Sequence, residues 1–250
     1  MDSGLYAAYT GLLSRTQALE TAANNLANSN SNGFRAQRDY FRGVYAGIAE
    51  ASDAGDGVAA AVNRFGILGG SLLDLTQGQL QRTGNPLDLA LSGMGFFQVR
   101  TATGTQLTRD GAFVRSETGT LVTQHGEPVL SGGGAPITLP TGAIHVGANG
   151  DISVSTAEGS AIAGRVAIVN YSAQDLQAAG SNRFVVRQDA KATAADATVE
   201  EGALEGANQD AVHGTVQLLM IQRQAEMMQK ALNVFHNEFD KTAAEELGRV

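Results

Sequence analysis

The stretch ANNLANSNSNGFRAQR, residues 23–38, ends one kind of structure and begins another. It follows a segment with the character of an amphipathic helix, and it places five asparagines within ten positions, ahead of a Gly-Phe pair. Asparagine tolerates the left-handed backbone conformation, and its amide can bond the backbone groups that a helix end leaves free. These residues therefore predict a sharp, specified exit from the helix: Asn28, Asn30, Asn32 and Gly33. Phe34 is placed to pack against that turn, although a flexible polar loop is the alternative.

The segment before this turn repeats leucine every seven residues, at Leu5, Leu12, Leu19 and Leu26. Three further residues follow four positions after the first three leucines: Tyr9, Thr16 and Ala23. This spacing is the a/d pattern of a coiled-coil seam. It predicts a helix over residues 3–28, roughly 40 Å long.

The opposite end of the chain carries a second seam, with alternating spacings of three and four residues. Its members are Leu218, Ile221, Ala225, Met228, Leu232, Phe235 and Phe239. Glutamines and charged residues fill the other faces, so the sequence predicts an amphipathic helix over residues 210–247, roughly 57 Å long.

Each stripe could pack on the body of its own domain, as most amphipathic helices do. A narrow stripe in a/d register is instead typical of a coiled coil. Two such helices at opposite ends of a chain most simply pair with each other. We therefore expect one discontinuous helical module that brackets everything between its two parts.

From about residue 66 the apolar period changes to two, which is the period of a β-strand. Leu87, Leu89 and Leu91 alternate with smaller or polar residues, and the dipeptide Asn149-Gly150 is suited to a tight hairpin turn between two further alternating runs. The chain also has 31 glycines and only 4 prolines, which indicates many turns. The middle of the chain is predicted to be an antiparallel barrel-like or sandwich-like domain.

Two segments rich in Ala, Asp and Gly predict linkers on either side of that domain. The expected fold is α+β, with a helical coiled-coil module from the two termini and a central antiparallel β-rich domain. The expected parts, in chain order, are the N-terminal helix and turn (1–45), a linker (46–65), the β domain (66–187), a second linker (188–207) and the C-terminal helix (208–250).

The sequence offers little for chemistry. A net charge of −8 without basic runs disfavours nucleic-acid binding, and the absence of cysteine removes thiolate metal sites and cysteine nucleophiles. The four histidines are scattered, and no phosphate loop, calcium loop or serine elbow is complete. No run is apolar over the 18 or so residues that a membrane span needs. We expect no enzyme activity, cofactor, metal, small-molecule substrate or membrane span.

Four segments together resemble the rod, hook and hook-associated proteins of the bacterial flagellar axial structure. They touch both ends and the middle of the chain: NNLANSNSNGFRAQR (24–38), TGNPLDLALSGMGFFQV (83–99), LTRDGAFVRSETGTLVTQHGEPVL (107–130) and LEGANQDAVHGTVQLLMIQRQAEMMQKAL (204–232). The sequence is most similar to the proximal-rod type, with the distal-rod type as the alternative. The segment LEGANQDAV departs from the family's more usual LE-x-SNV.

The resemblance implies a subunit whose terminal helices form an inner coiled-coil module while its β domain lies outward. Such subunits stack helically into a tube that serves motility. They leave the cell through the flagellar type III export apparatus without a cleaved signal peptide, which implies a periplasmic rod. The implied partners are other rod subunits, copies of this chain and the export apparatus.

The expected function is therefore that of a structural rod subunit; the alternative is a non-flagellar β-rich binding or cell-wall-active module. The expected assembly interface consists of the two seams and the asparagine turn: Leu5, Leu12, Leu19, Leu26, Asn28, Asn30, Asn32, Gly33, Phe34, Leu218, Ile221, Ala225, Met228, Leu232, Phe235 and Phe239.

Overall fold

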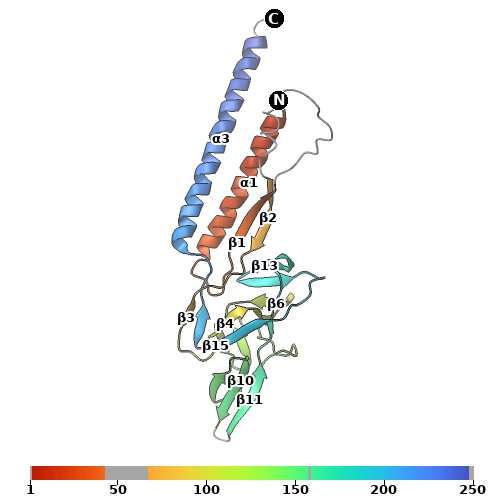
Figure 1. Cartoon of the computed structure of the whole chain (residues 1–250), viewed down its shortest axis with the longest axis vertical. Coiled ribbons are helices and arrows are strands. Elements are labelled where there is room, and N and C mark those ends of the chain that lie inside the picture. The colour runs from red at the N-terminus through yellow and green to blue at the C-terminus, as the bar shows by residue number, and fades with distance from the viewer. Residues whose placement is uncertain (1, 43–66, 157–158, 248–250) are drawn as a thin grey trace. The chain divides into compact units, whose positions relative to one another are not determined.

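The structure, a computed structural model, describes three stretches of the chain: residues 2–42, 67–156 and 159–247 (Figure 1). The chain divides into two compact units. The first unit takes in both ends of the chain and comprises Met1–Leu26, Gln37–Leu72 and Val212–Val250. The second unit comprises Ala27–Ala36 and Leu73–Ala211. The two ends therefore fall in one unit, while the asparagine turn belongs to the other.

The first unit contains two long helices and a pair of strands. Helix α1 spans Asp2–Ala27 and helix α3 spans Ala211–Leu247, each within a residue or two of the predicted bounds. Strand β1 (Gln37–Arg42) pairs with β2 (Ile67–Leu73) in a two-stranded sheet. These strands correct the expected division, in which residues up to 45 belong to a helix and turn and the β domain begins at 66. The predicted linker 46–65 lies outside the described residues.

The buried face of α1 differs from the predicted leucine seam. Its buried residues are small or polar: Gly11, Ser14, Ala18, Ala22 and Asn25. Leu12, Leu19 and Leu26 are only half-buried, and the side chain of Leu5 lies outside the described part. The other members of the expected seam, Tyr9, Thr16 and Ala23, are exposed. With 3.6 residues per turn, the buried face lies roughly a quarter turn away from the leucines.

Helix α3, in contrast, is least exposed along the predicted stripe. Leu218, Ile221, Ala225 and Met228 are half-buried, and Leu232 is buried with 9% exposure. Among the described side chains of this helix, only Gly214 is otherwise buried. Phe235 and Phe239 continue the stripe in sequence, but their side chains lie outside the described part.

The second unit is built of short strands, as the period-two pattern predicts. Its strands are β3 (Leu80–Arg82), β4 (Leu89–Met94), β5 (Phe96–Thr101), β6 (Gly104–Thr108), β7 (Phe113–Arg115), β8 (Leu121–Thr123), β9 (Ala143–Val146), β10 (Asp151–Thr156), β11 (Gly159–Arg165), β12 (Ile168–Val169), β13 (Leu176–Gly180), β14 (Arg183–Val186), β15 (Asp196–Glu201) and β16 (Ala203–Glu205). A short 3-10 helix, Ala173–Asp175, precedes β13.

These strands pair antiparallel in several small sheets. The largest has five strands in the order β12-β5-β6-β14-β13, and a three-stranded sheet has the order β11-β10-β9. The predicted hairpin about Asn149-Gly150 is confirmed, because β9 and β10 pair directly and Gly150 donates its N–H to Gly147 O. The main core lies between strands far apart in sequence, with Leu89, Phe97 and Ile152 among its fully buried side chains.

The predicted linker over residues 188–207 is wrong in its second half. Strand β15 pairs with β4 along its whole length, and β16 pairs with β3. The segment reads as polar because few of its side chains, such as Val199 and Ala203, point into the core. Its backbone ladder to distant strands is what makes it a strand, and local composition does not report that ladder. No helix in the described part of the chain combines the length and apolar character needed to cross a membrane.

Candidate assembly site

The exit from α1 is a pair of tight turns within the second unit. Ser31 donates its N–H to Asn28 O at 3.0 Å, and Phe34 donates its N–H to Ser31 O at 3.3 Å. The Ser31 hydroxyl also donates to the side-chain Oδ1 of Asn28 at 3.4 Å. The side chain of Asn28 thus bonds within the turn, which is the role that asparagine at a helix exit predicts.

Gly33 is required by its surroundings as well as by its backbone conformation. Its φ is +66°, in the left-handed region, and its N–H donates to Glu205 O at 2.7 Å. A Cβ at this position would lie only 2.3 Å from Arg109 C and 2.4 Å from Asp110 N. The turn is therefore pressed against the backbone of the β-rich unit at a point where only glycine fits.

A buried charge cluster lies next to this turn. Glu205 accepts from Arg35 Nη2 at 2.6 Å and from Arg109 Nη1 at 3.0 Å, and the side chains of Arg35 and Glu205 are fully buried. Glu205 Oε1 also accepts the Gly78 N–H at 2.8 Å. One carboxylate thus joins three segments: the turn, the start of the β-rich region and the segment that follows β6.

Arg109 has further partners that offset part of the cost of its burial. It donates to Leu91 O at 3.0 Å and to Gly93 O, and its guanidinium lies 5.6 Å from the centroid of the Phe96 ring. Burial lowers the pKa of Arg109 to about 10, against the attraction of Glu205, and the charge of Arg35 lowers it further. The Nε atoms of both arginines have no hydrogen-bond partner among the described residues. Removing Glu205 would leave two buried cations facing each other.

The asparagine turn and the buried charge cluster together form a region that we call the junction. Asn208, three residues before α3, makes a second set of links there. Its Oδ1 accepts the Ala36 N–H at 2.8 Å, and its Nδ2 donates to Asp74 O at 2.8 Å and to Thr76 O at 3.1 Å. Its own N–H donates to the carbonyl of the buried Phe34 at 3.3 Å. A single amide thus holds the strand-like segment after the turn and the segment that enters β3.

An open cavity of about 510 Å³ lies beside the junction, within the second unit. Seven side-chain amides line it: Asn30, Asn32, Gln77, Gln79, Gln81, Asn208 and Gln209. Asn208 and Gln77 are committed to bonds inside the unit, since Gln77 bonds Leu91 O and the Gly93 N–H. Asn30 is exposed. Its amide can donate and accept, so the wall suits contact with another polypeptide.

A comparable amide lies in the first unit, at Asn25 of α1. Its Nδ2 donates to Gln37 O at 2.8 Å, and its Oδ1 accepts the Gln37 N–H at 2.9 Å. The buried side chain therefore satisfies both backbone groups of the first residue of β1, as a paired strand would. Nearby, Thr21 donates to Asp39 at 3.1 Å. Burial raises the pKa of Asp39, and the bond from Thr21 opposes that shift.

Among the residues that the sequence singles out and whose side chains the structure describes, those of the asparagine turn lie together. Asn28, Asn32, Gly33 and Phe34 lie in one compact turn, while the two helical stripes belong to the other unit. Sequence reasoning missed the residues that hold this turn in place, which are Arg35, Arg109, Glu205 and Asn208. It also missed Asn25, which holds the start of β1 in the first unit. Glu205 and Asn208 stand in the LEGANQDAV segment, and both form the contacts described above.

The ion pairs and hydrogen bonds of this site, which we call the clamp, hold separate segments of the second unit together. Its one carboxylate, Glu205, bonds both guanidinium groups, and its amides bond to backbone. Among the residues that the structure describes, no three His, Asp or Glu side chains lie close enough together to hold a metal ion.

Comparison with known proteins identifies the class of protein to which this chain belongs. Residues 90–154 match the sequence model of the family described as "Flagellar hook protein FlgE/F/G D1 domain". The chain is 33% identical over its full length to the flagellar basal-body rod protein FlgF of Caulobacter vibrioides, which it also covers completely. It is 32% identical to FlgF of Escherichia coli, over 93% of this chain and 94% of that protein. It is also 32% identical to the rod protein FlgG of Bacillus subtilis, over 89% of this chain and 91% of that protein.

The chain therefore belongs to the family of flagellar basal-body rod proteins. The full-length similarity to FlgF from several bacteria supports a rod protein of the FlgF type within that family.

Proposed function

We propose that this chain is a structural subunit of the flagellar basal-body rod and that it joins neighbouring subunits, copies of itself included, through its terminal helices. The relatives to which it is similar over nearly its whole length are named as rod proteins. Those names describe a structural family rather than an enzyme family. A tubular drive shaft needs subunits that make several different contacts with their neighbours. Such heterologous contacts propagate as a filament when they do not close on themselves.

The observation that carries the assembly is the amount of apolar surface that α3 leaves exposed. Val212 is 71% exposed and Met227 is 62% exposed, and four more large apolar side chains of this helix are exposed: Val216, Leu219, Met220 and Val234. At 3.6 residues per turn these six residues gather on the side opposite the half-buried stripe. A helix with apolar residues on two opposite faces is suited to lie between other helices.

The clamp in the second unit has a different role in this proposal. Within that unit it holds the turn that follows α1 and the segment before α3 against the same β-rich body. The exposed Asn30 and the amide-lined cavity beside it then offer a polar contact surface to neighbouring subunits. We further propose a periplasmic rod and delivery by the flagellar type III export apparatus, both of which rest on family membership.

The test is Met227→Asp in the source bacterium, with a strain that lacks the gene as the background. A charge at this exposed apolar position would be buried without a partner once another helix covers it, so rods should be absent and swimming should be lost. Gln229→Asp is the matched control, because it puts the same charge on an exposed position of the same helix. Electron microscopy of basal bodies and a swimming assay give the readout.

Two outcomes would contradict the proposal. Intact rods and normal swimming in the gene-deletion strain would remove the rod function and favour a binding or cell-wall-active module instead. Normal incorporation of the Met227→Asp variant would remove the role of the exposed apolar face of α3, although a rod function could remain.

A further inference from the structure

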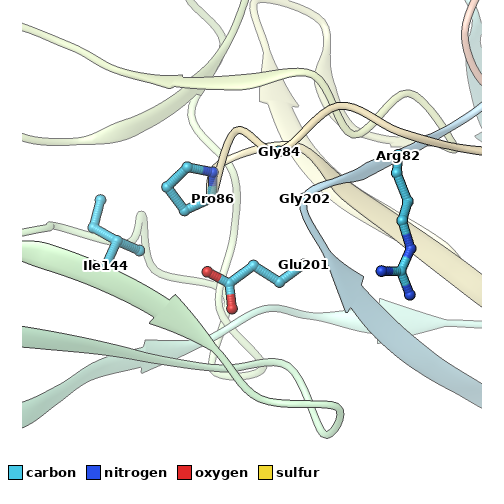
Figure 2. A pocket seen from close by; sticks show the side chains of 6 residues that line it. All are labelled: Arg82, Gly84, Pro86, Ile144, Glu201 and Gly202. Atoms are coloured by element: carbon cyan, nitrogen blue, oxygen red, sulfur yellow. The ribbon is translucent and has the colours of Figure 1, made fainter.

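A second open cavity, of about 480 Å³, lies at the other side of β3 within the β-rich unit. Six residues from three separate segments line it: Arg82, Gly84, Pro86, Ile144, Glu201 and Gly202 (Figure 2). Figure 2 shows the Glu201 carboxylate directed toward Ile144 and Pro86, while Arg82 extends on the other side of Gly202. The cavity therefore has an acidic part with apolar walls and a separate basic part.

The acidic part is the Glu201 carboxylate, which is held in place through only one of its two oxygen atoms. Glu201 Oε2 accepts the Val146 N–H at 3.1 Å and lies 2.6 Å from Nδ1 of the exposed His145. Its Oε1 has no hydrogen bond among the described residues. The carboxylate is thus fixed in direction and still able to accept from an incoming cation.

The basic part of the cavity is the guanidinium group of Arg82. Arg82 is exposed, and its side chain forms no hydrogen bond or ion pair with any residue that the structure describes. Its backbone is fixed, because it pairs with Ala203 across the β3–β16 ladder. The turn beside it is also fixed, since Gly202 O accepts the N–H groups of Thr83 at 2.8 Å and Gly84 at 3.1 Å.

The charges and walls of the cavity define the ligand that fits it. Neighbouring negative and positive groups match a ligand that carries both signs, which disfavours a plain anion or a plain cation. The lining contains no aromatic ring on which a sugar or a base could stack. Pro86 and Ile144 can instead cover the aliphatic stem of a lysine or arginine whose head reaches Glu201. A polypeptide loop with an acidic and a basic residue close together satisfies each of these features.

The chain itself carries such a loop, between β14 and β15. The loop is anchored at both ends, by Arg187 N–H to Asp175 O at 2.9 Å and by Thr193 N–H to Asn170 O at 2.8 Å. Between these anchors, Asp189 and Lys191 are exposed, and neither bonds any residue that the structure describes. Asp189 lies in a turn that the Ala190 N–H closes on Arg187 O at 3.1 Å, and Lys191 follows directly after that turn. The two charges are therefore exposed within three residues of one short loop.

We propose that this cavity receives the Asp189–Lys191 loop of a second copy of this chain, with Asp189 on Arg82 and Lys191 on Glu201. The contact is heterologous, because the cavity of one copy takes the loop of the next and leaves a free cavity and a free loop at the two ends. Contacts of this kind build an open helical row rather than a closed dimer. The inference rests on the proposed rod function and adds to it a specific contact between β-rich units.

Charge reversal tests the contact in the gene-deletion strain. Arg82→Glu should lower incorporation into rods about tenfold, since it sets like charges against Asp189 of the next copy. Asp189→Arg should do the same, and the double variant Arg82→Glu, Asp189→Arg should restore incorporation. Both positions are exposed and free of bonds to described residues, so each variant is expected to fold. Glu117→Arg, at an exposed position away from the cavity, is the control for a general effect of added charge.

Cross-linking gives a second readout, helped by the absence of native cysteine. In assembled rods the double variant Arg82→Cys, Asp189→Cys should give a ladder of covalent oligomers with a short bismaleimide, while each single variant gives none. Normal incorporation of Arg82→Glu together with no ladder would overturn the contact and leave the rod function standing. Normal rods in the gene-deletion strain would overturn both together.

Discussion

The junction in the β-rich unit and helix α3 in the first unit differ in the kind of side chain that they bury. At the junction almost every polar group is committed within the subunit, and Arg35 and Glu205 have no exposed side-chain surface. Along α3, large apolar side chains such as Val212 and Met227 remain mostly exposed. The polar residues are thus the more buried ones, and the apolar residues the less buried ones.

This inversion separates what a single subunit stabilises from what it leaves for others. Buried ion pairs and amide bonds specify one local geometry, because an unpaired partner would cost several kcal/mol. The exposed apolar face of α3, which lies opposite the half-buried stripe, specifies no geometry until another surface covers it. The junction should therefore respond to substitution by unfolding, whereas α3 should respond through assembly.

The largest effect on stability is expected for Glu205→Ala. Removal of this carboxylate leaves Arg35 and Arg109 buried without their counter-ion and should lower the free energy of unfolding by about 3–5 kcal/mol. Urea denaturation followed by far-UV circular dichroism gives the value. Glu200→Ala, at a half-buried neighbouring position, should change it little. Equal effects of the two substitutions would show that the buried cluster does not stabilise the junction.

A somewhat smaller loss is expected for Gly33→Ala. The left-handed conformation alone costs an alanine about 1–2 kcal/mol, and the overlap with the Arg109 backbone brings the expected loss to about 3 kcal/mol. Gly134→Ala isolates the conformational part, since φ is +77° there and nothing lies within 4 Å of the added Cβ. If the thermal midpoints of the two variants coincide, the close approach at Gly33 carries no energy.

The smallest of the three is expected for Asn25→Ala, in the first unit. It leaves the N–H and C=O of Gln37 without their side-chain partner and should cost about 1–2 kcal/mol. Hydrogen exchange at the Gln37 amide should quicken, while exchange in the β-rich core stays unchanged. Gln17→Ala, on an exposed face of the same helix, is the control. Unchanged exchange at Gln37 would mean that the leucine seam, rather than this amide, holds α1 in place.

The two terminal helices show where sequence periodicity succeeds and where it fails. For α3 the three-and-four spacing of Leu218, Ile221 and Leu232 marks the least exposed face. For α1 an equally regular repeat of leucine marks only a half-buried edge, because the buried face carries Ser14, Asn25 and small residues. Hydrogen bonds from Asn25 to a strand that follows the turn fix that face, and a hydrophobic pattern contains no sign of them.

The sequence by itself determined the two helices, the sharp turn after α1 and the β-rich middle, because apolar periodicity and turn residues such as glycine and asparagine act over a few residues. Tertiary structure alone decided the rest. Glu205, Arg109 and Arg35 lie far apart along the chain, and only folding brings their charges together out of water. The strands β15 and β16 likewise exist through backbone pairing with β4 and β3, so their polar composition could not announce them.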